Sequence, residues 1–80
     1  MPDTRQLMRQ ELGGGFGRRL RQKRLELGYS VDKLAEMAQL GRAQIVRIER
    51  GEGGDAGIAT VAMIASGLGV SPGWLAFGAD

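Results

Sequence analysis

The 80-residue chain contains no cysteine and no histidine. Disulfide frameworks are therefore excluded, and thiolate and imidazole metal ligands and the usual nucleophile and base pairs are missing. No apolar run approaches the roughly 20 residues that cross a bilayer, and the start, "MPDTRQLMRQE", is charged where a signal peptide is apolar. We expect a cytoplasmic protein that is not an enzyme, uses no metal or cofactor, binds no small-molecule ligand and does not enter a membrane.

The net charge is only +2, but the charges are unevenly distributed. Residues 1–24 contain seven basic and two acidic residues, residues 25–50 contain four of each, and residues 51–80 contain three acidic residues and no basic one. A basic half beside an acidic tail indicates a polyanionic partner on one side of the molecule. A basic helix that is merely solvated would give the same pattern, so charge alone leaves both interpretations open.

Apolar residues recur at helical spacing from Phe16 onwards, and no segment alternates with the period of two that is typical of a half-buried strand. Ser30 and Ser71 are suited to cap helices, and glycines stand where helices would end. Residues 1–15, which end in three glycines, are expected to form a flexible N-terminal arm. We predict an all-α domain over residues 16–78, with five helices at 16–27, 31–38, 42–50, 58–68 and 72–77.

The segment "GRAQIVRIERG", residues 41–51, has two isoleucines on one side of a predicted helix. At 100° per residue, Ile45 and Ile48 lie within about 60° of each other. The opposite side carries the outward-facing residues, Ala43, Val46, Arg47 and Arg50, with Arg42 at its edge. Because this helix follows another after a three-residue turn, "QLG", the pair has the layout of a helix-turn-helix, whose second helix enters the major groove of DNA.

Two longer stretches, "GYSVDKLAEMAQLGRAQIVRIERG" and "IATVAMIASGLGVSPGWL", resemble the phage-repressor type of helix-turn-helix family, also described as Cro/cI or XRE-like. The resemblance covers about residues 16–78. The matching positions are Leu34, Ala35, Ile45, the "RIERG" of 47–51 and the "LGVS" of 68–71. The resemblance implies a five-helix, lambda-repressor-like DNA-binding domain that contains a helix-turn-helix.

The resemblance also implies which residues contact DNA. Arg42, Ala43 and Arg47 match positions that reach base edges in the major groove, and Gln44 and Val46 flank them as auxiliary contacts. Arginine suits guanine because its planar fork donates to O6 and N7 together. The resemblance also implies phosphate contacts from Ser30 and Arg50, and the chain's departures from the family lead us to expect further ones from Arg18, Arg19 and Arg21 of the first helix.

Arg24 and Glu49 match positions that pair in the family as a partly buried bridge between the first helix and the recognition helix, so we assign them a structural role. The chain also departs from the family. Val31 stands where an amide commonly reaches a phosphate, and Glu52 and Asp55 bring negative charge into a loop that is commonly basic. These departures transfer part of the expected phosphate binding to the arginines of the first helix and to a second protomer.

A chain this short buries only about 60% of its unfolded surface, which makes self-association plausible. Trp74, with Met63, Leu75 and Phe77, is expected to form an exposed apolar patch that serves as a dimer interface. The N-terminal arm is a second expected contributor. In the alternative interpretation, Trp74 merely closes the core.

We therefore expect a homodimeric, sequence-specific transcriptional regulator that binds double-stranded DNA at a roughly palindromic operator and represses by occupying promoter DNA. Control of its own gene, or controller-type activation from a flanking site, is compatible with this size. The alternative is a protein-interaction module, such as an antitoxin or antiactivator, that retains the fold without binding DNA. Val31, Glu52 and Asp55 favour that alternative.

Overall fold

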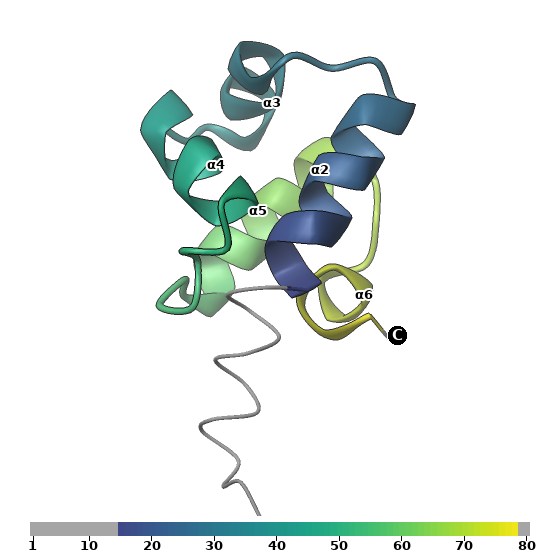
Figure 1. Cartoon of the computed structure of the whole chain (residues 1–80). Helices are drawn as coiled ribbons and strands as arrows, with labels where there is room; N and C mark the ends of the chain where they lie inside the picture. The colour runs from purple at the N-terminus through teal and green to yellow at the C-terminus, as the bar shows by residue number, and fades with distance from the viewer. Residues whose placement is uncertain (1–14, 79–80) are drawn as a thin grey trace, which may run out of the picture.

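Helix is the only regular secondary structure in residues 15–78, the part of the chain that the computed structural model describes. The all-α prediction is confirmed, and each helix boundary lies within one residue of the predicted one. Most of the expected N-terminal arm lies outside the described residues. None of the helices in this part combines the length and apolar character needed to span a membrane. The helices are α2 (Phe16–Glu26), α3 (Val31–Ala38), α4 (Arg42–Glu49), α5 (Ile58–Leu68) and α6 (Pro72–Phe77) (Figure 1).

Two of the helices begin at a serine that caps them. The hydroxyl of Ser30 accepts from the amide of Lys33 at 3.0 Å at the start of α3, and that of Ser71 accepts from the amide of Trp74 at 3.0 Å at the start of α6. Each hydroxyl satisfies a backbone donor that has no partner inside its helix. Pro72 follows Ser71 at the first helical position, where its fixed φ suits the helix and no backbone N–H is needed.

All five helices contribute a fully buried side chain to one core. α5 packs against α3 and α6, α2 packs against α4 and α6, and α3 packs against α4. Complete burial of a large apolar side chain contributes about 1.5–3 kcal/mol, so even the six-residue α6 is held by its core contact. The largest fully buried side chains are Phe16, Leu20, Leu34, Ile45, Ile64 and Leu75.

α2 and α4 approach each other closely at Gly17. A side chain of even one carbon at this position would overlap with the carbonyl oxygen of Ile48, near the end of α4. Only glycine therefore allows the two backbones to come this close. The contact determines how far α4 lies from the centre of the bundle.

The turn between α3 and α4 sets the start of α4. Gln39 adopts the left-handed conformation, with φ 58° and ψ 41°, which costs a residue with a side chain about 1 kcal/mol. The amide of Leu40 donates to the carbonyl of Ala35 at 2.9 Å, and the Leu40 side chain packs against the core. These contacts hold the turn in spite of the backbone strain.

Arg24 connects α2, the loop after it and α4. Its Nε and Nη2 donate to Oε2 and Oε1 of Glu49 at 2.8 and 2.9 Å, and its Nη1 donates to the carbonyl of Tyr29 at 2.8 Å. The side chains of Arg24 and Glu49 are only 11% and 10% exposed. The hydrogen bonds with Glu49 raise the pKa of Arg24, so the guanidinium stays charged although it is buried.

Replacement of Glu49 by alanine is expected to destabilise the fold by about 3–5 kcal/mol, because the buried charge of Arg24 loses its partner. Urea unfolding followed by circular dichroism measures this as a lower midpoint. Asp32→Asn is the matched control, since Asp32 also pairs with an arginine, Arg42, but at the surface, where a pair contributes about 0–1 kcal/mol. An equal loss of stability in both variants would contradict the structural role of Glu49.

Candidate nucleic-acid interface

One side of α4 is anchored in the core and the other is open. Ile45 and Ile48 have exposed fractions of 0% and 4%. Val46 is half-buried. The exposed side chains on the helix and directly after it are those of Arg42, Ala43, Gln44, Arg47 and Arg50. α4 therefore presents cationic and amide groups on the surface of the described chain.

Arg42, the first residue of α4, contacts the start of α3. Its Nε donates to Oδ1 of Asp32 at 2.9 Å. The two side chains are 63% and 75% exposed, and an exposed ion pair contributes only about 0–1 kcal/mol to folding. The contact therefore orients the guanidinium more than it stabilises the fold.

Gln44 caps the helix that carries it. α4 begins at Gly41, which has no side chain to accept a hydrogen bond, and Oε1 of Gln44 accepts from the amide of Gly41 at 3.1 Å. The first turn of α4 is thereby closed in the manner of half a capping box. The amide nitrogen of Gln44 is left as a donor at the same surface.

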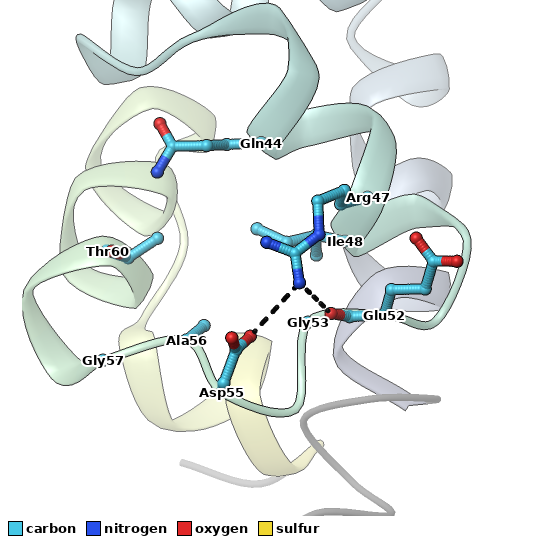
Figure 2. A pocket seen from close by; sticks show the side chains of 9 residues that line it. All are labelled: Gln44, Arg47, Ile48, Glu52, Gly53, Asp55, Ala56, Gly57 and Thr60. Atoms are coloured by element: carbon cyan, nitrogen blue, oxygen red, sulfur yellow. Dashed lines mark hydrogen bonds and ion pairs between the residues drawn. The ribbon is translucent and has the colours of Figure 1, made fainter.

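Arg47 points into a hollow between α4, the loop 51–57 and the start of α5 (Figure 2). Its Nη2 donates to the carbonyl oxygen of Glu52 at 3.3 Å and lies 3.7 Å from Oδ1 of Asp55. The side chains of Arg47 and Asp55 are 56% and 77% exposed. The acidic loop therefore contacts this arginine directly. Thr60 of α5, to which the sequence assigned no role, also lines the hollow.

Several predicted phosphate contacts lie on the surface. Arg18 and Arg21 are exposed on α2, and Arg50 is exposed just after α4. Ser30 is also exposed, and its hydroxyl caps α3. Contact of these residues with phosphate stays a prediction.

Arg19 has a different role from the phosphate contact predicted for it. Its Nε and Nη2 donate to the carbonyl oxygens of Leu75 and Ala76 at 2.9 and 2.8 Å. These carbonyls are near the end of α6, where a helix leaves acceptors unpaired and where positive charge suits the helix dipole. We therefore correct the assignment, because Arg19 connects α2 to α6 and belongs to the fold.

The four residues predicted to form one dimer patch do not lie together. Leu75 is fully buried, whereas half-buried Trp74 lies beside α2 and half-buried Met63 lies beside α3. Phe77 is 47% exposed and lies elsewhere, between α5 and α6. Leu75 points into the core, and Trp74 and Phe77 line different hollows, so the residues of α6 do not form one exposed patch with Met63. The predicted patch is wrong.

Phe77 belongs instead to an apolar groove between the start of α5 and α6. Ile58, the first residue of α5, is 90% exposed and also lines this groove. Its side chain is exposed although it lies at helical spacing from the buried Val61, because the first turn of the helix extends beyond the core. The full lining is Ala56, Gly57, Ile58, Val61, Pro72, Gly73, Ala76 and Phe77.

Comparison with known proteins agrees with this geometry. A family model described as helix-turn-helix matches residues 20–75, which include α3, the turn and α4 and amount to more than half of the chain. No curated protein and no solved structure matches the chain significantly. The chain belongs to the XRE-type helix-turn-helix family of DNA-binding transcription regulators.

Proposed function

We propose that this regulator is a homodimeric, sequence-specific repressor that binds a roughly palindromic operator and blocks a promoter by occupying it. The observation that carries the proposal is the open face of α4, with arginines and an amide on a helix whose other face is anchored in the core. The major groove is wide enough to admit such a helix. This function requires no catalytic group, and we propose no enzymatic activity.

The side chains of α4 have separate roles in this proposal. Arg42 and Arg47 donate to O6 and N7 of guanine, while Ala43 or Val46 contacts a thymine methyl group and Gln44 supplies an auxiliary contact. The phosphate contacts position the helix without selecting a sequence. They come from Ser30, Arg18, Arg21 and Arg50.

Arg47 has to leave the acidic loop before it contacts a base. Its ion pair with Asp55 is exposed and stabilises by only about 0–1 kcal/mol, whereas a bidentate contact with guanine discriminates by about 1–3 kcal/mol. Replacement of the ion pair with Asp55 by a contact with DNA is therefore favourable where a guanine is present. The same loop also supports the alternative function, a protein-interaction module without DNA binding, because its carboxylates repel phosphates.

A second copy of the chain is the occupant that we propose for the apolar groove. Ile58 and Phe77 expose large apolar side chains there, and no charged residue lines it. Ala56 and Gly57 line both this groove and the hollow that holds Arg47. A twofold-related copy packed on the groove would therefore lie beside the proposed DNA-contacting surface, so that two α4 helices meet one duplex, as palindromic half-sites require.

The wild-type protein is expected to bind a duplex that it enriches from a randomised DNA pool. Affinity should fall on the order of a thousandfold between about 50 and 200 mM salt, because the bound arginines release counterions from the DNA. Fluorescence anisotropy at several salt concentrations measures this loss. Absence of any complex at low salt would overturn the proposal and favour the protein-interaction alternative.

Arg47→Ala should reduce discrimination between the enriched duplex and a scrambled one by about 1–3 kcal/mol per protomer. Its melting temperature should stay almost unchanged, because the contacts of Arg47 are exposed. The control Arg50→Ala removes a proposed phosphate contact and should weaken binding to both duplexes alike. Unfolding of Arg47→Ala would assign this residue to the scaffold instead.

Ile58→Asp is expected to convert the dimer to a monomer in sedimentation velocity, because it places a charge in the apolar groove. Leu25→Asp is the matched control, since Leu25 is also an exposed apolar residue, 57% exposed, but lies on α2 outside the groove. It should leave the dimer intact. The interface assignment fails if Ile58→Asp sediments like the wild type.

A further inference from the structure

We propose that Asp32 is a positioning residue for sequence recognition, which holds Arg42 so that the outer edge of its guanidinium is available for guanine. This inference rests on the proposed DNA-binding function and assigns a role within it to a residue of α3. The observation behind it is the 2.9 Å hydrogen bond from Nε of Arg42 to Oδ1 of Asp32.

The choice of donor atom matters for base recognition. A guanidinium has five N–H donors in a fixed plane. Asp32 accepts from Nε, which lies on the edge of the guanidinium nearest to α4. Nη1 and Nη2 form the opposite edge, and two parallel donors of this kind match O6 and N7 of guanine. Arg42 can therefore keep its carboxylate partner while it contacts a base.

Arg47 provides the contrast. The atom that its loop contacts hold is Nη2, which belongs to the outer edge. Those contacts occupy a donor that a guanine would need, whereas the contact with Asp32 leaves both outer donors of Arg42 to the base. The two arginines therefore differ in what base contact requires. Arg42 can contact a guanine without losing its partner, whereas Arg47 first has to leave the loop.

The backbone on both sides of the Arg42 contact is fixed. Ser30 caps α3 two residues before Asp32, and the bond from the amide of Gly41 to Gln44 closes the first turn of α4 at Arg42. A held side chain loses less conformational entropy on binding than a free one. The ion pair is weak in water, but it strengthens when the duplex excludes water around it.

The position of Asp32 has an electrostatic cost. A carboxylate beside the proposed DNA surface repels phosphates of every sequence, so Asp32 lowers general affinity. Asp32 raises affinity only for sequences that place a guanine within reach of the oriented Arg42 side chain. Asp32 should therefore raise discrimination and lower non-specific binding at the same time.

The experiment compares Asp32→Asn with the wild type on the enriched duplex, on its single base-pair variants and on a random duplex, by fluorescence anisotropy at one salt concentration. We expect Asp32→Asn to lose about tenfold of discrimination at one base pair in each half-site, while it binds the random duplex as tightly as the wild type or more tightly. Glu36→Gln is the matched control, because it removes a carboxylate one turn further along α3 that is also exposed. It should leave discrimination unchanged.

The same comparison in an Arg42→Ala background separates positioning from direct contact. If Asp32 acts through Arg42, Asp32→Asn has no further effect on discrimination once Arg42 is gone. A remaining effect would mean that the carboxylate itself accepts from a base, such as N4 of cytosine, and would overturn the inference. Full discrimination by Asp32→Asn in the wild-type background would also overturn it, whereas a wild type that binds no duplex contradicts the proposed function itself.

Discussion

The orientation of α4 depends on the bidentate ion pair between Arg24 and Glu49. It joins the last turn of α2 to the end of α4, while Gly17 brings the start of α2 against the same end of α4. The two contacts lie at separate places along α2. Together they fix the direction of α4 relative to α2 as well as the distance between the two helices. Because Ile45, in the middle of α4, is buried in the core, the open face is aimed by groups that are themselves buried or nearly buried.

The basic residues of this chain divide into groups with different physical roles. Arg19 and Arg24 donate to carbonyl and carboxylate groups of the protein and hold the bundle together. Arg42 and Arg47 have carboxylate partners too, but at the surface, where water weakens each pair. Positive charge in the sequence is therefore a poor measure of the charge that DNA would meet, since part of it is used inside the fold.

The helices could be predicted from the sequence because apolar spacing and capping residues are local signals. Ile45 and Ile48 identified the buried side of α4, and Ser30 and Ser71 identified two helix starts. Contacts between elements could not be predicted in this way. No spacing along the chain indicates that Arg19 reaches the carbonyls of α6, and a six-residue helix is too short for its pattern to decide that Leu75 points inward.

The carboxylates around α4 bear on how a regulator of this size selects its site. Asp32, Glu52 and Asp55 all lie at or beside the surface proposed to contact DNA, and each weakens attraction to phosphate irrespective of sequence. A single domain whose sequence-independent affinity for DNA is reduced binds a duplex of random sequence only weakly. Tight binding then requires correct bases under Arg42 and Arg47 in two half-sites at once. Acidic residues near the interface are therefore consistent with specific binding, because they weaken the sequence-independent attraction to phosphate and leave the base contacts to supply the affinity.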